Sequence, residues 1–149
     1  MIRFGTLRHQ FVRSVPRELE AGVLYVSMEY ATAVHSCCCG CGEQVVTPLT
    51  PTDWCMTFDG ETVSLHPSVG NWNQKCRSHY IIKRGRVFEA APWSEKQVEA
   101  ERYRDKQSKA KYFGRTPDAL KNSAGAEPEA PKGFWSRLSI CLLYTSDAA

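Results

Sequence analysis

The sequence has no long hydrophobic run and no leader-like start. Within its 149 residues, no apolar stretch approaches the ~20 residues that a membrane-spanning helix needs, so we expect no membrane partner. The first residues, MIRFGTLRHQFV, lack the apolar centre of a secretory signal peptide. These absences predict a cytoplasmic protein in a reducing compartment, where clustered cysteines more often bind metal or catalyse than form disulfides.

A strong excess of one charge is also missing. Nineteen Lys and Arg residues stand against sixteen Asp and Glu residues, which leaves a net charge of +3. Nucleic-acid-binding domains concentrate much more positive charge on one face, so nucleic acid is not expected as a partner. The composition leaves the oligomeric state open.

Composition divides the chain into four segments. Residues 1–92 are rich in short strand-like runs, and residues 93–113 are typical of a solvated helix. Residues 114–140 are rich in Pro, Gly, Ala and charge, which predicts a flexible linker and a disordered tail. Residues 141–149, CLLYTSDAA, resemble translated read-through of a common sequencing adapter, and we expect them to be an artefact.

Residues 1–92 are expected to form short, mainly antiparallel strands. GVLYVSM, YATAVHSC and EQVVTPLTP are rich in β-branched and aromatic residues and end at Gly or Pro. WCMTFDGETVSL predicts a hairpin with Asp59-Gly60 as a two-residue type I′ turn, in which both residues need positive φ. HYIIKRGRVFEA predicts a second hairpin that turns near Arg84-Gly85. The fold class expected is therefore mainly β: a small antiparallel, zinc-stabilised domain with a C-terminal helix.

The helix is expected to begin at a capping box made by Ser94 and Gln97. Few apolar residues follow, so most of its surface should be solvated. Its basic side chains could instead contact phosphate or an acidic partner, which is the basis for an adaptor function considered below. They are Lys96, Arg102, Arg104, Lys106, Lys109 and Lys111.

The segment HSCCCGCGE, residues 35–43, indicates a metal site. Glycines at positions 40 and 42 allow the positive φ with which a backbone curls around an ion. Such a curl can aim the thiolates of Cys37, Cys39 and Cys41 at one point. The adjacent Cys38 faces the other way in an extended chain, and Cys55 is expected to pack as a small apolar residue.

A distant ligand should complete the site. Cys76 and His79 have the C-x-x-H spacing that lets both side chains reach one ion. Five candidate ligands then compete for the four places of a tetrahedral zinc: Cys37, Cys39, Cys41, Cys76 and His79. The spacing does not choose among them, but the surplus of ligands favours a closed, structural zinc site over a catalytic one with an open position.

Polar residues beside Cys76 are candidates for catalysis. Ser68 lies between Pro67 and Gly70, which predicts an exposed turn. A serine nucleophile needs a base in contact, and His79 or His35 could serve. Ser78 directly precedes His79, and neighbouring residues of a strand point to opposite faces, so Ser78 would need His35. Backbone N–H groups of Gly70 and Asn71 could bind an oxyanion.

Five motifs occur in order: HQFVRSVPRELEAGVLYVS, TAVHSCCCGCG, VVTPLTPTDW, VSLHPSVGNW and CRSHYIIKRGRV. Together, over about residues 8–92, they resemble the BubE-like family of bacterial ubiquitin-like conjugation operons. By position, the family's histidine falls on His35, its cysteines on Cys37, Cys39 and Cys41, and its two further motifs on residues 68–72 and 76–80.

The resemblance implies a zinc-containing, serine-type peptidase. Such an enzyme would remove a ubiquitin-like protein from conjugates or precursors, with Ser68, or alternatively Ser78, as the nucleophile and His79 or His35 as the base. The alternative interpretation is a non-catalytic, zinc-ribbon-like adaptor module that binds a ubiquitin-like protein without cleaving it.

Overall fold

A computed structural model describes residues 1–114 of the chain. The expected adapter-derived end and almost all of the expected linker lie outside the described residues. Residues Met1–Pro92 form one compact unit, and we describe it separately from the helix that follows. None of the helices in the described part of the chain is long and apolar enough to cross a membrane.

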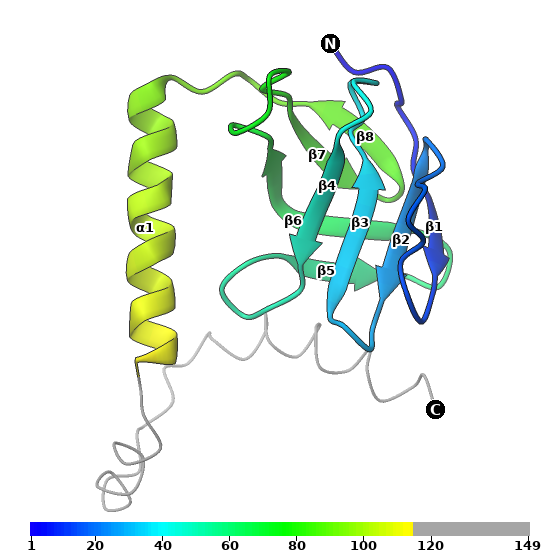
Figure 1. Cartoon of the computed structure of the whole chain (residues 1–149), viewed down its shortest axis with the longest axis horizontal. Coiled ribbons are helices and arrows are strands. Elements are labelled where there is room, and N and C mark those ends of the chain that lie inside the picture. Colours follow the sequence, from blue (N-terminus) through cyan, green and yellow to red (C-terminus); the bar gives the residue numbers. More distant parts are fainter. Residues whose placement is uncertain (115–149) are drawn as a thin grey trace, which may run out of the picture. The chain divides into compact units, whose positions relative to one another are not determined.

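The β unit consists of two four-stranded sheets (Figure 1). The first sheet contains β1 (Arg8–Phe11), β2 (Val23–Ser27), β3 (Thr32–Ser36) and β4 (Gln44–Pro48), in that order. The second contains β5 (Cys55–Phe58), β6 (Val63–Gly70), β7 (His79–Lys83) and β8 (Arg86–Glu89). The expectation of a mainly β fold is confirmed. All neighbouring strands are antiparallel except β1 and β2, which run parallel.

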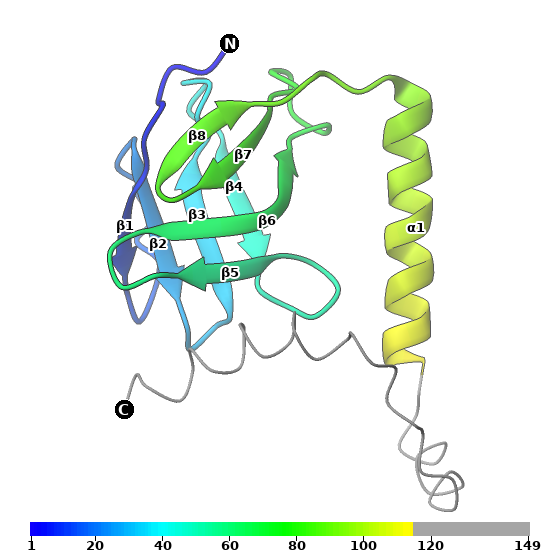
Figure 2. The ribbon, with the colours of Figure 1, turned by 180° about the vertical axis from the view of Figure 1, so that it is seen from behind.

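The core lies between the two sheets, which Figure 2 shows from behind. Leu24 and Val26 of β2 meet Leu65 of β6 and Ile82 of β7 in one apolar cluster, and all four side chains are at most 3% exposed. Burying a side chain of this size contributes roughly 1.5–3 kcal/mol. Cys37 and Cys38 belong to the same cluster, so the cysteine segment is anchored in the core.

The β5–β6 connection differs from the expected type I′ turn. Phe58 pairs with Val63, which leaves a four-residue loop in which only Gly60 has positive φ. The Asp59 carboxylate accepts hydrogen bonds from the backbone N–H groups of Glu61 and Thr62, at 2.9 and 2.6 Å. This side-chain bonding competes with the tight turn and explains why the prediction was wrong.

The second predicted hairpin is confirmed. Lys83 pairs with Arg86, so Arg84 and Gly85 alone connect β7 to β8. Both have positive φ, 50° and 71°, as a type I′ turn requires.

Helix α1 spans Glu95–Phe113 and begins at the expected capping box of Ser94 and Gln97. Val98 is its only buried residue, so the helix is largely solvated as expected. Part of its basic charge is paired within the helix, Arg104 with Glu101 and Lys109 with Asp105.

Candidate functional site

The β6–β7 pair places the candidate residues on two opposite faces. Val69 pairs with Tyr80, and Gly70 with His79. Val69 and Tyr80 point into the core, where they are 2% and 0% exposed. Because side chains alternate along a strand, Ser68 and His79 lie on the outer face, whereas Ser78 lies on the core face with Tyr80. Ser78 and His79 are adjacent in the sequence, but their side chains therefore have different surroundings.

On the outer face, Ser68 and His79 form a hydrogen-bonded pair. The Oγ of Ser68 lies 2.8 Å from Nε2 of His79, and Nδ1 of His79 lies 2.7 Å from the carbonyl oxygen of Ala91. A carbonyl oxygen can only accept, so Nδ1 carries a proton. In the neutral imidazole, Nε2 is then the acceptor for the Ser68 hydroxyl. This is the arrangement of a nucleophile, a base and a group that orients the base.

The structure places Ser68 in a different element from the one that the sequence predicts. It lies within strand β6 and not on a turn, in a stretch where the β6–β7 register shifts between Leu65 and Val69. Bulged strands re-aim side chains and occur often beside active sites. Here Ser68 is half-buried and reaches the histidine at the start of β7.

Trp72 lies against the same pair. The centroid of its indole ring is 5.0 Å from that of His79. A Cβ atom built on Gly70 would lie 2.4 Å from Trp72 Nε1, closer than any side chain allows. Position 70 must therefore be glycine for the indole to lie where it does. This gives a physical reason why a glycine stands two residues before Trp72 in the sequence Gly70-Asn71-Trp72.

Four cysteines converge near the core face. The Sγ atoms of Cys37, Cys39, Cys41 and Cys76 all lie within 4.8 Å of one another. Cys37 Sγ is 3.4 Å from Cys39 Sγ and 3.9 Å from Cys76 Sγ. A tetrahedral ion with metal–sulfur bonds of about 2.3 Å needs sulfurs about 3.8 Å apart. The group fits such an ion, and His79 and Cys55 are not part of it.

Two loops bring these sulfurs together. After β3, the Cys37 N–H donates to the Glu43 carbonyl and the Gly40 N–H to the Cys37 carbonyl. Gly40 and Gly42 have φ of 86° and 85°, as the predicted curl requires. The other loop, between β6 and β7, carries Cys76. The Gln74 side chain joins the loops by donating to the Gln44 carbonyl at 3.2 Å.

The thiols differ in acidity. Burial raises the pKa of Cys76, but hydrogen bonding with Ser78 and with the Cys39 and Cys41 thiols outweighs it and brings the pKa down to about 7. Burial and hydrogen bonding to the other thiols raise the pKa of Cys39 to about 12. Cys38 lies outside the group, and burial raises its pKa to about 12. Cys76 is thus converted more easily than Cys39 to the thiolate that binds metal.

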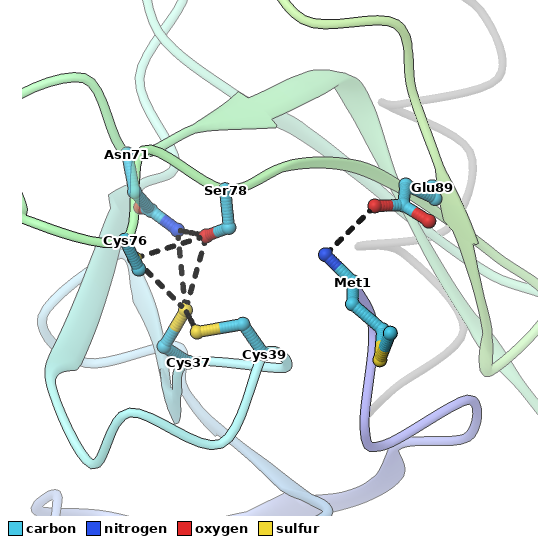
Figure 3. Close-up of polar contacts among 7 residues, drawn as sticks. All are labelled: Met1, Cys37, Cys39, Asn71, Cys76, Ser78 and Glu89. Atoms are coloured by element: carbon cyan, nitrogen blue, oxygen red, sulfur yellow. Dashed lines mark hydrogen bonds and ion pairs between the residues drawn. The ribbon is translucent and has the colours of Figure 1, made fainter.

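Asn71 and Ser78 lie next to the Cys37 sulfur (Figure 3). Asn71 Nδ2 donates to Ser78 Oγ at 2.8 Å, and Ser78 Oγ is 3.1 Å from Cys37 Sγ. Asn71 Nδ2 also lies 3.5 Å from Cys37 Sγ. Because the Asn71 amide already donates to Ser78 Oγ, the Ser78 hydroxyl can direct its own proton to Cys37 Sγ. A thiolate at Cys37 would therefore receive two hydrogen bonds.

His35 is a core residue. Its side chain is fully buried, Nε2 lies 2.8 Å from the Tyr80 hydroxyl, and Nδ1 has no hydrogen-bond partner. Burial lowers its pKa to about 4, so the ring is neutral near pH 7. Among the described residues, no hydrogen bond joins His35 to Ser68 or Ser78.

Reasoning from the sequence missed three contributors. The Asn71 side chain, the Tyr80 hydroxyl and the Ala91 carbonyl all bond to candidate residues. Asn71 and Tyr80 lie in the motifs at residues 68–72 and 76–80, which could have indicated them, whereas Ala91 lies in no motif. The Asn71 backbone N–H, predicted to bind an oxyanion, donates to the Ser78 carbonyl at 2.9 Å and so cannot bind one. The Gly70 N–H remains a candidate donor to an oxyanion.

Comparison with known proteins supports the resemblance. A family model described as "Bacterial ubiquitination-like system serine protease (BubE)" matches residues 11–90, just over half of the chain. No curated protein and no solved structure matches the chain significantly.

Proposed function

The chain belongs to the BubE family of bacterial ubiquitination-like system serine proteases, and from that premise we propose that it is a peptidase of serine type with a structural zinc. Its substrate is a ubiquitin-like protein, which it releases from conjugates or from a precursor. The observation that carries the proposal is the chain of two contacts from Ser68 through His79 to the Ala91 carbonyl.

In this mechanism Ser68 is the nucleophile. His79 Nε2 takes the hydroxyl proton while Oγ attacks the carbonyl carbon of the peptide or isopeptide bond. The same nitrogen then gives the proton to the leaving amine. The Ala91 carbonyl keeps the proton on Nδ1 and so holds Nε2 as the acceptor, the orienting task that a carboxylate has in other serine proteases. Water completes the cycle by hydrolysing the acyl-enzyme.

The Gly70 N–H is the remaining donor for the oxyanion. Removing one such donor costs about 3 kcal/mol in a well-studied protease. Trp72 covers one side of His79 and restricts the positions that the imidazole can take.

Zinc is proposed to be held by Cys37, Cys39, Cys41 and Cys76, a closed set of four thiolates that binds the ion as a cross-link between two loops. Asn71 and Ser78 support this group, which assigns Ser78 to the metal site and not to catalysis. His35 and Tyr80 belong to the same buried hydrogen-bonded group. A cytoplasmic location suits this proposal, because a reducing compartment keeps the four thiols available to metal.

The test is a ubiquitin-like protein of the same system fused through its C-terminus to a reporter. The wild-type protein should release the reporter, and Ser68→Ala should not. The adaptor hypothesis predicts the opposite outcome: the fusion binds, and neither protein cleaves it.

A further inference from the structure

Strand β6 has an edge without a partner beside Ser68. Strand β5 pairs with β6 only from Val63 to His66, yet β6 continues to Gly70. Beyond His66, the described part of the chain contributes a neighbour on one side only, strand β7. The unpaired edge therefore extends over residues 67–70, the stretch that contains Ser68.

The backbone groups of Gly70, at the end of this stretch, point outward. The Asn71 N–H donates to the Ser78 carbonyl, so these two residues form a hydrogen-bonded pair of the antiparallel ladder. Pairs alternate in type, which makes Gly70 and His79 a non-hydrogen-bonded pair. The His79 carbonyl agrees with this, because it accepts from the Ala90 N–H on the β8 side. The N–H and C=O of Gly70 thus face the free edge.

Ser68 lies two residues earlier on the same edge strand, in the stretch where the β6–β7 register shifts. Both residues are only half-buried. An exposed edge is a template for pairing with another chain, and folded proteins usually cover or charge such edges. This one carries the hydroxyl of the Ser68–His79 pair.

We propose that residues Ser68–Gly70 bind the substrate as an added β-strand, the occupant being the extended C-terminal tail of the ubiquitin-like protein that precedes the bond to be cleaved. The inference rests on the proposed function and adds its mode of substrate recognition. Main-chain hydrogen bonds hold a peptide in this mode, and the tail is laid alongside the strand that carries the nucleophile. The last residue of the tail lies opposite Gly70, so that its N–H donates to the Gly70 carbonyl and its own carbonyl, the one attacked, accepts from the Gly70 N–H. A helical segment cannot make these bonds because its backbone groups are already paired, so the site selects extended chains.

A backbone-ester scan tests the proposal. The probe is an eight-residue peptide with the sequence of that tail, linked at its C-terminus to a fluorogenic amine, with one amide at a time replaced by an ester. In a strand only every second residue faces β6. Because the free edge is short, only one or two esters, at alternate positions near the bond to be cleaved, should lower kcat/KM by about three- to tenfold, the loss of one hydrogen bond. The neighbouring esters serve as matched controls with little effect. Equal effects at all positions, or none, would overturn strand addition.

Absence of cleavage would count against the proposed function and would not by itself decide this inference. Hydrogen exchange of the wild-type protein with excess unmodified peptide then decides it. Slower exchange at the Gly70 amide, with no change at Val69, whose N–H faces β7, would support strand addition. Unchanged exchange at Gly70 would overturn it.

Discussion

Ser68 Oγ and His79 Nε2 lie 2.8 Å apart on the outer face of the second sheet. The Cys37, Cys39, Cys41 and Cys76 thiols form a separate group that contacts the opposite face of the same β6–β7 pair through Ser78, whose Oγ is 3.1 Å from Cys37 Sγ. One pair of strands thus separates the candidate chemistry from the candidate metal site. The two can be perturbed independently, although their residues are adjacent in the sequence.

Replacing Ser68 by alanine should abolish cleavage and leave the metal content unchanged. Loss of the nucleophile removes a step that no neighbouring group can supply, and kcat should fall by more than ~10³-fold. Reporter release from the fusion measures activity, and elemental analysis measures bound metal. The matched control is Ser78→Ala, which should retain measurable cleavage. If Ser78→Ala is inactive while folded and Ser68→Ala cleaves normally, the nucleophile is assigned to the wrong serine.

Removing the metal should unfold the β unit. A domain of about ninety residues buries a thin core, and metal binding contributes to folding where a site joins loops. We expect about one zinc per chain, and a chelator should cause loss of β-sheet circular dichroism together with loss of the ion. A metal-free protein with the same spectrum and melting temperature would show that the four cysteines are not a structural zinc site.

Asn71→Ala should weaken metal binding without removing a ligand. The amide holds Ser78 Oγ at 2.8 Å and contacts Cys37 Sγ, and loss of such supporting contacts costs about 10–100-fold in metal affinity. Competition with a chromophoric chelator measures the change. Lys75→Ala, an exposed position in the same loop, serves as a control in which affinity should fall much less. Equal affinities of Asn71→Ala and the wild type would contradict the supporting role.

The strands and the cysteine curl could be predicted because both depend on local chemistry. Runs such as VLYVS stabilise strands by their own propensity, and glycines at 40 and 42 permit the backbone that the curl needs. The Asp59-Gly60 turn was mistaken because the Asp59 carboxylate bonds the N–H groups that follow it. That outcome depends on one side chain and not on the dipeptide pattern.

The partner of His79 could not be predicted. Spacing from Cys76 favoured a metal ligand, whereas contact with Ser68 depends on the register of β6 against β7, which shifts at a bulge. No local sequence pattern predicts that shift in register. The role of Asn71 was equally inaccessible, because its amide meets Cys37, which lies 34 residues earlier in the chain.

His35 should remain neutral well below the pH at which histidines usually titrate. Burial lowers its pKa to about 4, compared with about 6.5 in an unfolded chain. The unfolded state therefore binds the proton first, and stability should fall as the pH decreases from about 6.5 towards 4. The ring signals of His35 in NMR spectra should stay constant from pH 8 to pH 5. A titration midpoint near 6.5 in the folded, metal-loaded protein would contradict this.

Gly70→Ala should impair cleavage through Trp72. The new Cβ would meet Trp72 Nε1 at 2.4 Å, so the indole must move, and it lies against the imidazole of His79. We expect kcat/KM to fall by at least about tenfold, since a displaced base loses its contact with Ser68. Trp72→Ala opens the space that the methyl group needs. In that background the added Gly70→Ala should cost much less, and a double-mutant cycle measures the difference. Equal costs of Gly70→Ala in both backgrounds would show that the glycine serves cleavage by a route other than the position of Trp72.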